Sequence, residues 1–275
     1  MKKTAIWLGS FALTICLLIS ITHAQEEEEC DLQCESQREA QDPTASINGV
    51  FFSNTIGFGP ESDNTLYNFQ VQPIATVAQE EWGNVLLRGI VPVLGVPTPV
   101  PGDEGNLDTE FGLGDTTVQA IFIPSNQEGF TFGFGPQISL PTHTDTATKS
   151  SEWGAGLVGA GFGFAGPLSY GVLVTQMWGD EDLFNETTLQ PIAYYNLETP
   201  VLGPWFFGYN AIITHDWNAG QEDNWTVPIG LTVGKTIILP SKDAATINIG
   251  AYDLVESGQT DNEWQLRFSF NLLFN

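Results

Sequence analysis

Few residues of this chain could carry out covalent chemistry. Apart from His23, the sequence has two histidines, His143 and His215, and each stands near the start or end of a loop rich in polar residues. The serines nearest to His143 are Ser150 and Ser151. A phospholipase-type hydrolase needs a histidine and a serine held together. No pattern in the sequence brings such a pair together, so we interpret both histidines as interfacial or loop residues and predict no enzymatic activity.

Cofactor and metal motifs are absent from the sequence as well. It contains no Gly-rich phosphate loop and no zinc or calcium motif of the usual spacing, so we predict no cofactor and no metal site. The loop carboxylates could bind divalent cations that bridge lipopolysaccharide, because clustered oxygen ligands suit calcium and magnesium. Solvation of the loops is the simpler interpretation. These carboxylates are Asp103, Glu104, Asp108, Asp180, Glu181, Asp182, Glu222 and Asp223.

The N-terminal segment predicts export. Residues 1–24 start with two lysines, continue in an uncharged apolar run and end in Thr-His-Ala. This pattern is typical of a secretory signal peptide, with cleavage between Ala24 and Gln25, and the run is too short for a lasting membrane helix. In an oxidising compartment we expect Cys30 and Cys34 to form a local disulfide rather than a metal site.

The composition limits the class of protein. The chain carries 33 Asp and Glu against 8 Lys and Arg. Such acidity argues against binding to nucleic acid or to anionic membrane surfaces. The aromatic content of 12% argues against an acidic disordered chain. Residues 25–42 are charged and short of large apolar side chains, so we predict a periplasmic leader there and one large domain over residues 43–275.

The remaining sequence alternates with the period of two that is typical of β-strands. Clear examples are residues 65–78, 130–140, 225–235 and 264–274, where one face is apolar and the other is rich in Gly, Thr, Gln, Asn and Ser. The charges gather in the connections instead. This distribution favours an all-β fold, a closed antiparallel transmembrane β-barrel with lipid outside and a polar lumen. A secreted β-sandwich or jelly roll is the alternative.

The connections and the tryptophans indicate how such a barrel is oriented. Short connections alternate with long acidic ones, which gives about 12 strands with both chain ends on the periplasmic side. The third, sixth and seventh strands alternate poorly. Tryptophans beside the connections predict aromatic girdles at the two membrane interfaces. They are Trp153, Trp178, Trp217, Trp225 and Trp264 beside long loops, and Trp82 and Trp205 beside short turns.

The second face of each strand predicts the lining of the lumen. A barrel of about 12 strands should have a narrow, partly obstructed pore. Arg88 and Arg267 are the sharpest candidates, because a charge on the lipid face would cost about 2–4 kcal/mol. Facing inward, they could guide anionic or polar solutes, or pair with an acid and brace the barrel. The predicted lining is Gln70, Gln72, Arg88, Gln119, Gln137, Gln190, Tyr194, Asn196, Asn210, Lys235 and Arg267.

The C-terminal strand resembles the signal that the barrel assembly machinery recognises in outer-membrane proteins. It ends in an alternating series with a penultimate aromatic residue, followed by Asn275 as a departure from the usual pattern. The series is Leu266, Phe268, Phe270, Leu272 and Phe274.

Longer phrases of the sequence resemble one barrel family. From about residue 42 to the end, "FQVQPIATV", "LLRGIVPVLG", "FGLGDTTVQAIF", "GFGPQISLPTHTD", "NWTVPIGLTVGK" and "EWQLRFSF" occur in the order and spacing of the family labelled "Putative MetA-pathway of phenol degradation". The leader with Cys30 and Cys34 and the phrase "AYDLV" depart from it. The resemblance implies an outer-membrane barrel that passes small, hydrophobic or aromatic compounds.

The sequence therefore predicts a passive channel or facilitator in the bacterial outer membrane. Its expected partners are outer-membrane lipid, the barrel assembly machinery and a small-molecule solute. The alternatives are a structural or surface-interaction barrel with a plugged lumen and, further behind, a phospholipase-type membrane enzyme. An open pore requires the leader to lie outside the lumen, whereas a plugged barrel would have its lumen sealed by side chains or by residues 25–42.

Overall fold

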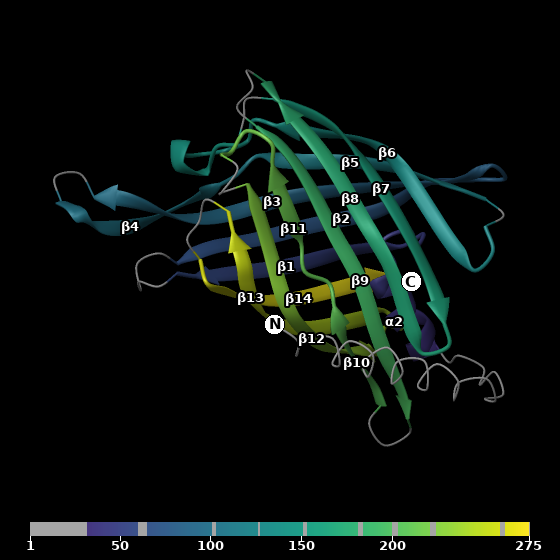
Figure 1. The fold of residues 1–275 in the computed structure, drawn as a ribbon. Coiled ribbons are helices and arrows are strands. Elements are labelled where there is room, and N and C mark those ends of the chain that lie inside the picture. The colour runs from purple at the N-terminus through teal and green to yellow at the C-terminus, as the bar shows by residue number, and fades with distance from the viewer. Residues whose placement is uncertain are drawn as a thin grey trace, which may run out of the picture. The chain divides into compact units, whose positions relative to one another are not determined.

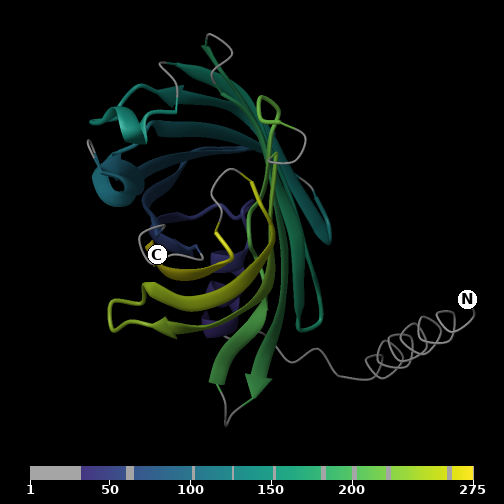
Figure 2. The ribbon, with the colours of Figure 1, turned by 60° about the vertical axis from the view of Figure 1, so that its left-hand side comes forward.

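The first and last strands of the chain pair with each other and close a sheet. In the computed structural model, β1 (Asn48–Phe58) runs antiparallel to both β2 (Leu66–Glu80) and β14 (Trp264–Phe274). Figures 1 and 2 show the resulting ring of strands. The structure describes residues 32–59, 65–100, 103–125, 127–150, 153–180, 184–199, 203–220, 224–258 and 262–274.

The other strands follow in chain order, each pairing antiparallel with its neighbours. They are β3 (Gly83–Val100), β4 (Asp103–Leu113), β5 (Thr116–Pro124), β6 (Phe130–Leu140), β7 (Gly154–Ala165), β8 (Leu168–Gly179), β9 (Asn185–Thr199), β10 (Gly203–Tyr209), β11 (Ile213–Asp216), β12 (Trp225–Ile238) and β13 (Ala244–Ser257).

Two positions in the barrel are each filled by two strand segments. The first half of β3 pairs with β5 and its second half with β4, while β10 and β11 both pair with β9 and β12. Within the described residues the strands therefore occupy twelve positions of a closed antiparallel barrel, as the sequence predicts.

One predicted loop is a strand pair instead. The sequence places a long loop around residues 95–115, but β3 continues to Val100 and pairs with β4. Pro97 and Pro99 made the segment look irregular. Both lie beyond Gly95, the last residue of β3 that pairs with β2, so β3 is an edge strand there. A missing N–H costs little at an edge, which is where strands tolerate proline.

The two ends of the barrel differ in their connections. One end, here called the short-turn end, carries tight turns such as residues 81–82 and 166–167. The other, the loop end, carries the longer connections such as residues 141–153, which contain the 3₁₀-helix η1 (Thr146–Thr148). In the turn after β7, Gly166 has a φ of 57°, a left-handed conformation that glycine adopts without strain.

Helix α2 (Leu32–Gln41) lies inside the ring of strands at the short-turn end (Figure 2). Its sequence has no β-branched residue, and Glu35 in the first turn and Arg38 in the last complement the helix dipole. The sequence assigns these residues to a separate leader, whereas in the structure they share one compact unit with the barrel, over residues 32–275. No helix in the described part of the chain has the length and hydropathy to span a membrane.

The outer face of the barrel is apolar. The C-terminal series points outward along β14, with Phe268, Phe270 and Phe274 each more than a third exposed. The seven tryptophans proposed for the girdles are also exposed by 41–59%. They lie at or close to the ends of strands, next to the connections where the sequence analysis placed them.

Candidate functional site in the barrel lumen

A cavity of about 330 Å³ lies inside the barrel. It is lined by side chains of strands from all around the ring, together with the segment that links α2 to β1. Nine of the eleven predicted lumen residues line it: Gln70, Gln72, Arg88, Gln119, Gln137, Gln190, Tyr194, Asn210 and Arg267.

The other two predicted lumen residues lie elsewhere. Asn196 is 3% exposed and hydrogen-bonds to α2, below the cavity. Lys235 lies on the outward face of β12, and its Nζ stands 5.5 Å from the centre of the exposed Trp205 ring. The prediction for Lys235 is wrong because its neighbours Gly234 and Thr236, not Lys235, occupy the inward parity of β12. A lysine near a strand end can extend along an aromatic ring toward the interface.

Five strands each contribute one polar and one apolar residue to the cavity wall, at successive inward positions. The polar residues we call the polar belt: Gln72, Arg88, Gln119, Thr175 and Gln190. One pleat closer to the short turns is the apolar belt: Ile74, Leu86, Ile121, Leu173 and Ile192. All five apolar residues are less than 9% exposed. Sequence reasoning missed the apolar belt, although each member has the same parity as its polar neighbour two residues away.

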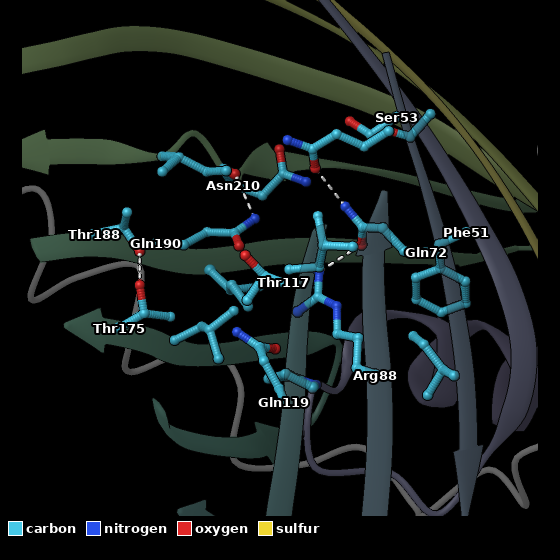
Figure 3. Close-up of a pocket in the computed structure, with 18 of the residues that line it drawn as sticks. Phe51, Ser53, Gln72, Arg88, Thr117, Gln119, Thr175, Thr188, Gln190 and Asn210 are labelled. Carbon is cyan, nitrogen blue, oxygen red and sulfur yellow. Dashed lines mark hydrogen bonds between the residues drawn. The ribbon is translucent and has the colours of Figure 1, made fainter. Parts of the chain in front are cut away.

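Arg88 stands in the polar belt and points into the cavity (Figure 3). Its Nη2 donates to Gln72 Oε1 at 2.5 Å, and Gln72 Nε2 donates to Gln70 Oε1 at 2.6 Å. Its Nε is buried and has no hydrogen-bond partner. The guanidinium is therefore held by neutral groups and keeps donors that are not used.

Arg267 reaches the same cavity from β14. Its Nε donates to Ser53 Oγ at 3.2 Å, and its Nη1 donates to the Asn210 carbonyl at 3.0 Å. Gln190 Nε2 donates to the same carbonyl at 2.9 Å. This carbonyl is available because residues 210–212 interrupt the strand between β10 and β11. The sequence gives no signal for that interruption.

The hydrogen bonds of the two arginines go to neutral groups in the described part of the chain. Among the described residues, neither Arg88 nor Arg267 forms an ion pair with a carboxylate. Both side chains line the same cavity. The hypothesis that they pair with an inward acid and brace the barrel therefore finds no partner in the described part of the chain.

Helix α2 closes the cavity at the short-turn end. Gln37 Nε2 and Gln41 Nε2 both donate to Asn196 Oδ1, at 2.6 and 2.8 Å. Asn196 Nδ2 in turn donates to Ser169 Oγ and to the Pro167 carbonyl. The helix is thus attached to two neighbouring strands through one buried amide. By the criterion set out from the sequence, the lumen is plugged at this end.

Two further contacts hold α2 in the lumen. Gln33 Nε2 donates to the Thr236 carbonyl at 2.9 Å, and Arg38 Nη2 donates to the Gly166 carbonyl at 3.2 Å. The Arg38 guanidinium also lies over the Phe164 ring. Ala40, near the end of the helix, and Ala45 and Ile47, beyond it, pack in one cluster with members of the apolar belt.

The loop end of the barrel brings a histidine and a carboxylate together. His143 Nδ1 lies 2.7 Å from Asp115 Oδ1, and the Ser150 N–H donates to Asp115 Oδ2. Within the described residues no hydroxyl hydrogen-bonds to the His143 ring, and Ser151 lies outside them. His215 packs between the rings of Trp217 and Trp225. Neither histidine has the surroundings of a hydrolase site.

Several predictions lie outside the described residues. These are the cleavage site at Ala24 and Gln25, and Cys30. Cys34, in α2, is disulfide-bonded. Among the residues that are described, no three potential metal ligands come together.

Comparisons with known proteins agree with this architecture. The model of the family "Putative MetA-pathway of phenol degradation" matches residues 54–172, so the resemblance noted from the sequence is confirmed over that range. No curated protein sequence is significantly similar to the chain.

Solved structures with a similar fold are outer-membrane barrels. An outer membrane channel from Pseudomonas putida F1 has a TM-score of 0.58 at 13% identity, covering 90% of this chain and 100% of that one. Outer membrane phospholipase A from Escherichia coli has a TM-score of 0.41 at 12% identity, covering 84% and 97%. The first likeness shows the fold, and the second is too weak to bear on function.

Proposed function

We propose that the chain is an outer-membrane barrel that acts as a passive channel or facilitator for small hydrophobic or aromatic molecules, and that it is not an enzyme. The observation that carries this proposal is the cavity inside the closed barrel, with its polar belt and its apolar belt. A solute that passes through such a lumen meets hydrogen-bonding groups and then an apolar wall. The label of the matching family, and the likeness in fold to a channel, support the same conclusion.

The outer face supports placement in a membrane. Its exposed aromatic and aliphatic side chains would face water in a soluble protein, whereas in lipid they are favourable. The tryptophans beside the connections suit the two interfaces. With export through residues 1–24, this leads us to propose the outer membrane as the location.

Helix α2 sets the condition for transport. As long as the helix is docked, the short-turn end is closed, so a solute can pass only when α2 leaves or shifts. The plug is attached by hydrogen bonds from polar side chains, among them Gln33, Gln37 and Gln41, and such contacts exchange with water at modest net cost. This favours a plug that can be released over a barrel sealed for a purely structural role.

The test is single-channel conductance in planar bilayers. We compare the chain starting at Gln25, a truncated chain starting at Pro43, and the full chain with Glu35→Gln as a control in an exposed residue of α2. We expect rare or small ion steps from the full chain and from the control, and frequent, larger steps from the truncated chain. If the truncated barrel is folded and inserted but silent, the channel proposal is wrong and a structural barrel is the better account.

A further inference from the structure

We infer that the lumen holds a binding site for a small amphipathic carboxylate, a monoanion whose charged group contacts Arg88 and Arg267 and whose apolar body lies on the apolar belt. The inference rests on the proposed function in one respect, namely that small molecules enter this lumen from the loop end. It adds the chemical class of the ligand and the residues that select it.

The two cationic groups of the cavity favour an anion beside them. Asp42, Asp115 and Glu186 also line the cavity, but among the described residues the guanidinium groups of Arg88 and Arg267 hydrogen-bond only to neutral acceptors: Gln72 Oε1, Ser53 Oγ and the Asn210 carbonyl. A buried cation without a counter-charge is costly, and two that repel each other are more so. A bound anion between them would relieve both costs.

The geometry of the donors fits a carboxylate. A guanidinium has five N–H donors in a planar fork, which matches the two oxygens of a carboxylate. Arg88 uses one of its donors in a hydrogen bond to Gln72, and its buried Nε has no partner. Arg267 uses two. Donors therefore remain on both side chains for oxygens of a ligand.

The apolar belt selects the rest of the ligand. Leu86 lies one pleat below Arg88, about 6.8 Å along the strand, which is the length of a small ring or a short alkyl chain. Ile74, which pairs with Arg88 across β2 and β3, and Ile121, which pairs with Leu86 across β3 and β5, line the same cavity. A small inorganic anion would leave the apolar belt in contact with water, whereas a phenyl or alkyl group would cover the belt. The cavity of about 330 Å³ is within the size range of small-molecule sites.

The loop end favours a single negative charge. Glu186 lines the same cavity on the loop side, and Asp216 lies beside it across the pairing of β9 and β11. Two carboxylates at the entrance repel a dianion about twice as strongly as a monoanion. Binding of small aromatic or aliphatic monocarboxylates is therefore preferred over phosphate-like dianions.

Isothermal titration calorimetry on the folded mature protein in detergent tests the inference. The probes are benzoate, with benzyl alcohol as its uncharged counterpart and acetate as the carboxylate without an apolar body. We expect benzoate to bind with a dissociation constant on the order of 1 mM or tighter, and the other two probes to bind about tenfold more weakly or more. Equal binding of benzoate and benzyl alcohol, or no binding of benzoate, would overturn the inference.

Matched charge variants locate the site. Arg88→Gln and Arg267→Gln should each weaken benzoate binding by about tenfold or more, whereas Lys235→Gln removes one charge from the outward face and should leave it unchanged. An equal loss in all three variants would show a general effect of charge and contradict the site. Heat-modifiable migration and circular dichroism establish that each variant is folded. Glutamine is chosen at position 88 because its amide can still hydrogen-bond to the neighbouring Gln72.

The outcome of the binding experiment does not depend on whether the channel proposal is correct. Benzoate binding is measured without transport, so a barrel that is silent in bilayers but binds benzoate through both arginines upholds the inference and contradicts the channel. A barrel that conducts ions after removal of α2 but does not bind benzoate upholds the channel and overturns the inference.

Discussion

The two ends of this barrel differ in how side chains from the same strands fill the lumen. At the short-turn end, α2 and the apolar belt fill the lumen, and the buried amide of Asn196 hydrogen-bonds to the helix and to Ser169. Toward the loop end lies the cavity, whose lining includes carboxylates such as Asp115 and Glu186. The barrel thus has a packed end that behaves like the core of a soluble protein and a hollow end with charged side chains.

This contrast teaches where stability and function lie. Close packing makes the short-turn end sensitive to loss of volume or of a hydrogen bond, because neighbours relax only partly. At the loop end, side chains such as Leu113 are exposed, so water can replace a contact that is lost there. The same substitution should cost more at the short-turn end, and the following predictions test this difference from the largest effect to the smallest.

The largest effect is expected from a matched pair of leucines. Leu86→Ala removes a 3% exposed side chain from the apolar belt and should lower the free energy of unfolding by about 3 kcal/mol. Leu113→Ala, in the β3–β4 hairpin at the loop end, removes a 39% exposed side chain and should cost about 1 kcal/mol or less. Urea unfolding of both variants in the same detergent measures the difference. Equal costs would contradict the packed end.

Asn196→Ala should come next, at about 2 kcal/mol. The change leaves the amides of Gln37 and Gln41 without their shared acceptor and Ser169 Oγ without its donor, all inside the barrel. Asn84→Ala is the control at the same end, because Asn84 makes one exposed hydrogen bond, to Ser46 Oγ. Besides the urea midpoint, bilayer recordings should show more frequent openings for Asn196→Ala alone. An unchanged opening frequency would mean that Asn196 does not hold the plug.

Asp115→Asn should cost about 1 kcal/mol and act locally at the loop end. Both carboxylate oxygens accept hydrogen bonds, from the His143 N–H and the Ser150 N–H, and an amide offers one acceptor in their place. The connection between β6 and β7 should loosen, so trypsin should cleave after Lys149 faster. Asp253→Asn, an exposed carboxylate near the loop end of β13, is the control. A global loss of stability without faster cleavage would refute the local assignment.

The sequence predicted the barrel better than it predicted the lumen. Alternation along β6, β12 and β14 depends on the lipid, which demands an apolar outer face on every strand, so the fold and the twelve positions could be derived. The inner face is not in contact with lipid, so its residues can be polar or apolar. Along single strands it places Gln72 beside Ile74 and Arg88 beside Leu86 at successive inward positions, and the cavity that these side chains line together is formed by strands far apart in the sequence.

Contacts between distant segments explain the remaining differences. The acidic composition of residues 25–42 resembles that of a disordered leader, and nothing local shows that Gln37 and Gln41 find one acceptor more than 150 residues away. Lys235 was assigned to the lumen, but it has the outward parity of Val233 along β12. Its position close to the end of the strand lets its charged group reach the interface beside Trp205.

The smallest effect concerns pH and again separates the two ends. Burial raises the pKa of Asp42, against the lowering effect of hydrogen bonds from Thr44, and burial with the nearby Glu35 and Asp42 charges raises the pKa of Glu39. With raised pKa values, the docked segment binds more protons than the released one. Docking therefore strengthens as the pH falls through these raised values and weakens above them. Glu39 is partly exposed, so solvent screens its share.

Bilayer recordings at pH 7 and pH 4.5 measure this dependence. We expect severalfold fewer openings at the lower pH, because protonation of Asp42 and Glu39 favours the docked plug. Asp42→Asn with Glu39→Gln removes both titrating groups and should flatten the profile, while carboxylates at the loop end continue to titrate and keep their effect on ion preference. If the double variant retains the full pH dependence of opening, the loop end rather than the plug is the pH-sensitive end of the barrel.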